Sequence, residues 1–122
     1  MRVFKTKWFV RYMRRSGVSD DMLIEAVERA ERGIIDADLG GDVIKQRVAR
    51  RGQGRSGCYR MLIAFRSRAR TVFIYAFAKN ERDNIDGEEL VTLQELAAEW
   101  LTMGDAQIEK ALADKRIEEV ER

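Results

Sequence analysis

Several residue types are scarce or missing in this sequence, and each absence removes a class of chemistry. The chain has no histidine and a single cysteine, Cys58. Histidine therefore cannot act as a general acid or base, and no intrachain disulfide can form. A His and Cys ligand set for a metal is excluded as well, and Asp36 and Asp38 have a spacing that turns use far more often than divalent ions do. We expect no metal and no cofactor.

Long apolar segments are also missing. No stretch approaches the ~20 apolar residues that a membrane-spanning helix needs, and residues 1–15 lack the continuous apolar segment of a signal peptide. We therefore expect a cytoplasmic protein with no membrane association. With 122 residues and 45% hydrophobic content, residues 1–122 suit a single domain with one core.

Acidic residues are absent from residues 43–70, and this absence indicates a kind of partner. A surface of one charge sign is typical of proteins that bind polyanions. The nine basic side chains of the stretch are Lys45, Arg47, Arg50, Arg51, Arg55, Arg60, Arg66, Arg68 and Arg70.

The charge is distributed unevenly along the whole chain. Residues 1–70 carry 17 Lys or Arg against 8 Asp or Glu, whereas residues 71–122 carry 6 against 13. Two interpretations of the acidic half stay open: an acidic element beside a basic face for nucleic acid, or the solvated face of two helices.

The basic residues lie on predicted strands. In residues 42–49, Ile44, Gln46 and Val48 alternate with Lys45 and Arg47, so the two cations share one face. Residues 58–65 and 71–78 are apolar runs rich in β-branched and aromatic residues, which indicates two neighbouring strands. The run 71–78 is apolar on both faces and is predicted to be central. A rigid sheet can hold cations at fixed spacing against a phosphodiester.

Two further predictions concern Arg60 and the loop that precedes its strand. Arg60 is predicted to lie on the exposed face of its strand. The Gly-rich segment 50–57, RRGQGRSG, is predicted to be a hairpin loop. It is not a phosphate-binding P-loop, because the Gly-Lys-Ser/Thr ending before a helix is missing.

Helices are predicted on either side of the three strands. A short strand at 2–5 precedes a helix over 7–16, in which the i, i+4 pairs Trp8 with Tyr12 and Phe9 with Met13 are expected to face inward. Ser19 is a good N-cap for a second helix that stops at Gly33. This helical hairpin has one apolar side and is expected to bury it on the sheet.

The C-terminal part is predicted to be helical, with its end left open. Asp86 and Glu89 resemble a capping box, and Leu93, Leu96 and Trp100 are expected to fix the helix on the core. Residues 105–113 form a weaker helix after Gly104. Residues 117–120 fit either a continuation of that helix or an edge strand. We expect 105–122 to be an accessory segment for docking or for homo-oligomer formation, dispensable for folding.

The fold class is therefore α+β, with a small antiparallel sheet, an N-terminal helical hairpin and C-terminal helices. In this order of elements, the segments LGGDVIKQRVAR, GRSGCYRMLIAF and above all YAFAKNERDNI closely resemble the RelE/HigB-like toxins of bacterial type II toxin–antitoxin modules. The resemblance covers about residues 3–113. It implies cleavage of mRNA, usually in the ribosomal A site, and a cognate antitoxin, here of helix-turn-helix type.

The resemblance also implies a set of site residues. Lys45 and Arg47 match basic positions before the loop, Arg60 resembles an arginine that contacts the scissile phosphate, and Lys79 and Arg82 match the Lys-x-Glu-Arg ending. These give the catalytic candidates Lys45, Arg47, Arg60 and Lys79. The RNA-binding candidates are Arg50, Arg51, Arg55, Tyr59, Arg66 and Arg82.

The chain departs from the family pattern at two positions. Asn80 stands where well-known members have a catalytic arginine, and Asp86 stands near the place of a tyrosine. RNA cleavage by the 2′-hydroxyl needs a base, cations for the phosphorane and a donor for the leaving oxygen. Lys45 is the candidate base, since neighbouring cations favour its neutral form, and Lys79 or Tyr59 is the candidate acid.

Three functions remain open on the sequence alone. The first is a metal-independent, ribosome-associated endoribonuclease that inhibits translation, and the acid-free basic sheet favours it. The second is an inhibitor of DNA gyrase that works through protein contacts, like the ParE relatives, and the missing catalytic groups favour it. The third is a basic nucleic-acid-binding module without catalysis.

Overall fold

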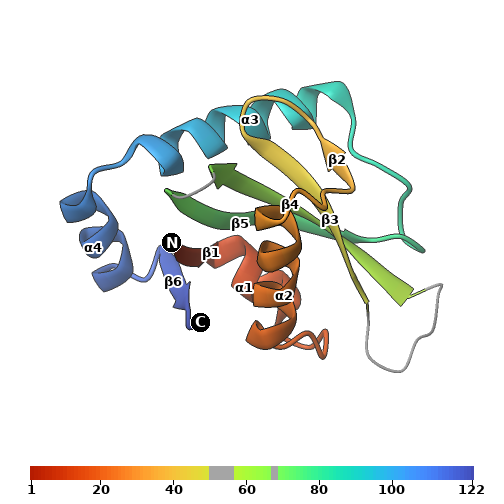
Figure 1. The fold of residues 1–122 in the computed structure, drawn as a ribbon, viewed down its shortest axis with the longest axis horizontal. Helices are drawn as coiled ribbons and strands as arrows, with labels where there is room; N and C mark the ends of the chain where they lie inside the picture. Colours follow the sequence, from red (N-terminus) through yellow and green to blue (C-terminus); the bar gives the residue numbers. More distant parts are fainter. Residues whose placement is uncertain (50–56, 67–68) are drawn as a thin grey trace.

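The computed structural model describes residues 1–49, 57–66 and 69–122 as one six-stranded sheet with helices on both faces (Figure 1). The strands are ordered β2-β3-β4-β5-β1-β6 across the sheet. The elements are β1 (Arg2–Thr6), α1 (Lys7–Met13), α2 (Asp20–Glu31), β2 (Ala37–Asp38), β3 (Val43–Ala49), β4 (Cys58–Arg66), β5 (Arg70–Ala78), α3 (Gly87–Thr102), α4 (Asp105–Ala113) and β6 (Ile117–Val120).

The three predicted strands form the antiparallel part of the sheet. β3 pairs with β4 and β4 pairs with β5, both antiparallel. β5 is interior, as its two apolar faces predicted, because β1 lies on its other side. The β1–β5 pair is parallel, so the sheet is mostly rather than entirely antiparallel. A bulge in β5 at Ile74 shifts the register opposite Leu62 and Ile63; it places Ile74 and Tyr75 on the same face.

The helical hairpin covers one face of the sheet, as predicted. Ser19 caps α2 by accepting a hydrogen bond from the Met22 N–H. α1 is shorter than expected and ends at Met13. Phe9 and Met13 are buried, but Trp8 remains 41% exposed, so the expectation that both aromatic pairs of α1 face inward is wrong for Trp8. The reason is geometric, because Trp8 lies about 100° around the helix from Phe9. Its ring therefore stacks on Tyr75 of β5 and does not enter the core beside Phe9.

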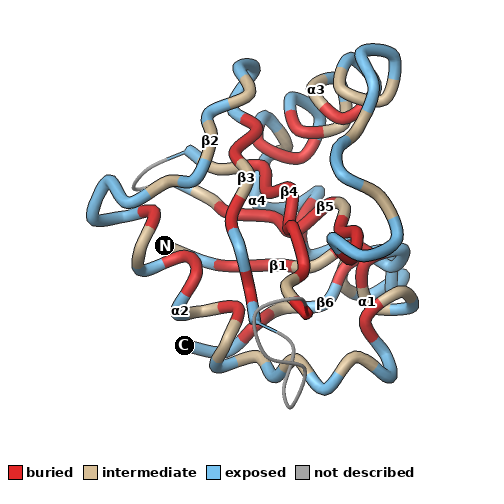
Figure 2. The backbone as a smooth tube through the Cα atoms, turned by 90° about the vertical axis from the view of Figure 1, so that its right-hand side faces the viewer, coloured by how far each residue is buried: buried red, intermediate tan, exposed pale blue. Residues whose placement is uncertain are grey.

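α3 and α4 cover the other face. Asp86 and Glu89 form the predicted capping box, with the Asp86 carboxylate accepting from the Glu89 N–H at 2.8 Å. Leu93 and Trp100 are buried against the strands, while Leu96 is half-buried. Figure 2 shows the buried backbone concentrated in the strands and in the inner sides of the helices. The sheet therefore lies between two apolar layers.

The C-terminal segment is part of the sheet. Residues 117–120, for which the sequence left two conformations open, form the edge strand β6, antiparallel to β1. Ile108, Ala111, Ile117 and Val120 are at most 2% exposed. This burial argues against the expectation that 105–122 are dispensable for folding, because a short apolar face can still be completely covered when it closes a sheet edge.

Ion pairs tie the same segment to the rest of the chain. Arg2 contacts Glu119 and Glu109, each at 2.9 Å, and Arg122 contacts Glu31 at 2.8 Å. The hydrogen bond from Arg122 lowers the pKa of Glu31, and the one from Arg2 lowers the pKa of Glu119. Among the described residues, no helix is long and apolar enough to cross a membrane.

Deleting residues 105–122 is predicted to unfold the protein. Ile108, Ile117 and Val120 each contribute roughly 1.5 to 3 kcal/mol through burial, which together is comparable with the typical stability of a whole domain. Thermal unfolding followed by circular dichroism checks this. Deletion of 121–122 alone is the control and should keep a cooperative transition, since it removes one surface ion pair. A cooperative transition in the longer deletion at the wild-type temperature would contradict the prediction.

Candidate nucleic-acid interface

The pleat of β3 turns Lys45 and Arg47 toward the α3 face of the sheet. Gln46 points the opposite way and is completely buried. Its side-chain amide nitrogen donates to the backbone oxygens of Ala26 and Ile34, both at 3.0 Å. These bonds fix the orientation of β3, so the two cations are held on the other face, as the alternation predicted.

Arg60 lies at the centre of the basic face. It pairs directly with Arg47 on β3 and with Phe77 on β5. Cross-strand neighbours on one face have Cβ atoms about 5 Å apart, and like charges at that distance repel. Arg47 and Arg60 are therefore neighbours on one face of the sheet.

The side chain of Arg60 is more deeply covered than predicted. It is 9% exposed, so the expectation of an exposed position is wrong. Its Nη1 atom is buried and has no hydrogen-bond partner among the described residues. Alternation gives the face on which a side chain lies, but not how completely its neighbours cover it. A buried cationic donor without a partner costs free energy, and an anion such as a phosphate would satisfy it.

Arg47, Arg60 and Phe77 form a row across β3, β4 and β5. One lysine lies on each side of this row along the strand direction. Lys45 is opposite Leu62, two residues along β4 from Arg60. Lys79 follows Phe77 by two residues, and its N–H donates to the Cys58 oxygen at 3.1 Å, which extends the ladder by one step. The Cα atoms of Lys45 and Lys79 are therefore separated by about four residues, or ~13 Å, along the strand direction. Arg60 lies between them.

Arg82 is held within the chain. Its guanidinium donates two hydrogen bonds to the Glu89 carboxylate, at 3.0 and 2.6 Å, and lies 5.6 Å from the Phe77 ring centroid. The Arg82 hydrogen bonds, followed by that of the Asp86 backbone, lower the pKa of Glu89 from 4.5 to about 2. The pair is consequently ionised at neutral pH and is lost only as the pH falls toward 2. This pair ties the end of β5 to α3.

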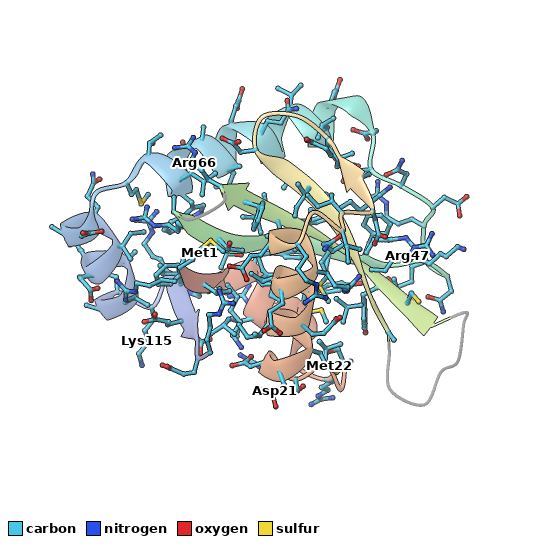
Figure 3. The ribbon with its side chains drawn as sticks, in the orientation of Figure 1. Met1, Asp21, Met22, Arg47, Arg66 and Lys115 are labelled. Carbon is cyan, nitrogen blue, oxygen red and sulfur yellow. The ribbon has the colours of Figure 1, made fainter. Side chains whose placement is uncertain are left out.

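The structure does not place the other predicted site residues that it describes beside Arg60. Tyr59 is 6% exposed and packs edge-on against Tyr12, with ring centroids 6.2 Å apart, on the opposite face of the sheet from Arg60. Arg66 pairs with Asp42 at 2.9 Å. Figure 3 shows Arg66 and Arg47 at opposite ends of the sheet. Arg50, Arg51 and Arg55 lie outside the described residues.

Phe77 is the component that the sequence analysis missed. Its buried ring is the direct cross-strand neighbour of Arg60 and the surface on which Arg82 stacks. The hairpin register would have indicated it, but the bulge in β5 hides that register from simple counting. In the part of the chain that the structure describes, no three His, Cys, Asp or Glu side chains are grouped to hold a metal ion.

Comparison with known families identifies the family of this chain. A family model described as the RelE toxin of the RelE/RelB toxin–antitoxin system matches residues 1–120. The chain belongs to the RelE toxin family. The toxin matches no curated protein in sequence. Membership confirms the resemblance seen in the motifs and means that the chain is the toxin of a toxin–antitoxin pair, with an antitoxin as its partner.

Substituting Arg60 by Met is predicted to stabilise the free toxin. The change removes a buried charge opposite Arg47 whose Nη1 atom has no hydrogen-bond partner among the described residues. Replacing buried charges by apolar groups of similar volume is often neutral or stabilising by about 1 to 4 kcal/mol. Chemical denaturation measures the difference.

Arg66→Met is the matched control on the same strand. It should change stability by about 1 kcal/mol or less, because it breaks an exposed ion pair. A large loss of stability in Arg60→Met would show that Arg60 supports the fold and would contradict this account.

Proposed function

We propose that this toxin is a metal-independent endoribonuclease that cleaves mRNA on the ribosome and so inhibits translation. The observation that carries the proposal is the buried, unpartnered Nη1 of Arg60 beside Arg47. A folded protein accepts such a destabilisation most often at a functional site. Two adjacent guanidinium groups match the oxygens of a phosphodiester in charge and in shape.

The arrangement supports an in-line displacement at phosphorus. The Lys45 amine takes the proton of the 2′-hydroxyl, whose oxygen then forms a bond to the adjacent phosphorus. Arg47 and Arg60 hold the non-bridging oxygens as negative charge builds on them. The bond from phosphorus to the 5′-oxygen breaks, and Lys79 protonates that oxygen. The products are a 2′,3′-cyclic phosphate and a 5′-hydroxyl end.

The positions of the two lysines support these roles. Attack and departure occur on opposite sides of phosphorus, so the base and the acid must flank the phosphate. Lys45 and Lys79 lie on either side of the row formed by Arg47, Arg60 and Phe77. Lysine can take both roles in a chain without histidine, and the proposal assigns no role to Asn80.

The remaining candidates have supporting roles in this proposal. Arg82, neutralised by Glu89, positions the Phe77 ring beside Arg60. Arg50, Arg51 and Arg55 would add phosphate contacts along the RNA through charge alone. The antitoxin, of helix-turn-helix type, would neutralise the toxin in the cell.

The test is the rate of mRNA cleavage on programmed ribosomes, measured by primer extension. Arg60→Ala should lower the rate by ~10²-fold or more, the usual cost of losing one donor to a developing negative charge. Arg66→Ala is the matched control, at the other end of the same strand, and should cleave at the wild-type rate. Circular dichroism shows that both variants are folded.

Two results would contradict the proposal. Equal rates for the two variants would remove Arg60 from the reaction. Absence of cleavage by the wild-type toxin, together with inhibition of DNA gyrase supercoiling, would replace the nuclease by a ParE-like inhibitor.

A further inference from the structure

An apolar groove lies along α3, on the side that faces α1. It has a volume of about 420 Å³. Apolar side chains of α3 form one wall and Trp8 with Tyr75 forms the other. Its lining residues are Thr6, Lys7, Trp8, Ile74, Tyr75, Leu93, Leu96, Trp100 and Arg116.

Aromatic stacking builds the outer wall of the groove. The Trp8 ring stacks on Tyr75, with centroids 4.6 Å apart, and on Tyr12 at 5.0 Å. Trp8 is nevertheless 41% exposed. A large aromatic side chain that is rigidly held but uncovered is typical of an anchor for a protein partner.

The groove continues toward the beginning of α3. A second hollow of about 360 Å³ shares Tyr75 and Leu93 with the first and is also lined by Asp86, Glu88, Glu89 and Thr92. From Glu88 to Trp100 the two hollows follow twelve residues of α3, which is about 18 Å. A partner helix of about three turns, which is ~16 Å long, would cover most of this length.

The two ends of the groove carry opposite charges. Lys7 and Arg116 lie at the end beside Trp100, and the Arg116 guanidinium is 5.2 Å from the Trp100 ring centroid. Asp86 and Glu88 lie at the other end. The occupant must therefore be apolar along its length, acidic at one end and basic at the other.

We propose that this groove binds a three-turn amphipathic helix of the antitoxin, running antiparallel to α3. A helix with acidic residues in its first turn and basic residues in its last is stabilised by its own dipole. Such a helix places its first turn beside Lys7 and Arg116 and its last beside Asp86 and Glu88. Apolar anchors at i, i+3, i+4 and i+7 fill the space between Trp8 and Leu96.

This docking surface includes none of the proposed catalytic residues Lys45, Arg47, Arg60 and Lys79, although Glu89 of the second hollow is the ion-pair partner of Arg82. The opposite flank of α3 faces the β2–β3 connection, where Gln94 donates to the Leu39 oxygen at 3.1 Å. Arg47 and Arg60 lie on β3 and β4, whereas the groove is formed by α3, α1 and the end of β5. The inference goes beyond the nuclease proposal, and either can fail without the other.

The test uses the full-length toxin and the protein encoded by the reading frame adjacent to its gene. Leu96→Glu places a carboxylate in the apolar groove and should raise the dissociation constant about 30-fold or more, the size of a hot-spot loss. Val91→Glu is the matched control. Val91 is 54% exposed and lies on the far side of α3 from Leu93, so this variant should bind as the wild type does.

A second variant, Lys7→Glu, and a second measurement, fluorine NMR of the tryptophans, test the same groove independently. Lys7→Glu changes an exposed residue at the basic end and should also weaken binding. Both tryptophans of the toxin, Trp8 and Trp100, line the groove. With 5-fluorotryptophan in the toxin alone, both fluorine resonances should shift on saturation with the antitoxin.

Each contrary result overturns the inference. Tight binding by both Leu96→Glu and Lys7→Glu, or unshifted fluorine resonances in a formed complex, would place the antitoxin elsewhere. Dissociation of a toxin dimer by Leu96→Glu would assign the groove to a second copy of the chain. Loss of mRNA cleavage in a folded Leu96→Glu variant would show that the groove is not independent of the catalytic face.

Discussion

The sheet has to hold Arg60, whose Nη1 atom is buried without a hydrogen-bond partner among the described residues, directly opposite Arg47 on the adjacent strand. A sheet does not hold two like charges opposite each other without support from elsewhere. Here the support comes from both faces: α1 and α2 pack on one side of β4 and β5, and α3 and α4 pack on the other. Because the strands are fixed by these two layers, Arg47 and Arg60 keep fixed positions relative to each other.

Local patterns in the sequence predicted much of this arrangement. Alternation identified the shared face of Lys45 and Arg47, and the caps at Ser19 and Asp86 form as expected. These features depend on residues a few positions apart, where backbone geometry is decisive. The site residues were predicted from the same alternation together with the resemblance, and the structure brings Lys45, Arg47, Arg60 and Lys79 to one end of one face.

The features that the sequence did not predict depend on distant contacts. β6 forms because Ile117–Val120 meets β1 at the other end of the chain, and a short segment carries no sign of such a partner. The depth of Arg60 and the exposure of Trp8 depend on what neighbouring elements cover, which periodicity does not encode. Tyr59 was a candidate acid, yet one step of the pleat places it on the opposite face from Arg60. The groove beside α3 arises in the same way, since α1, α3 and β5 form it together.

Two surfaces of the toxin differ in character. The basic face of β3 and β4 suits a phosphodiester, and the apolar groove between α1 and α3 suits a protein helix. α3 contributes to the groove and is tied to the end of β5 by the pair Arg82 and Glu89.

In the proposed function, Arg60 binds the scissile phosphate. The most direct test is ¹⁵N NMR of the arginine side chains during titration with an mRNA oligonucleotide that carries a 2′-deoxy sugar at the cleavage position and so cannot react. The account predicts that the guanidinium resonances of Arg60 and Arg47 shift together and that Arg66 stays unchanged. Binding that shifts other arginines but leaves Arg60 unaffected would contradict it.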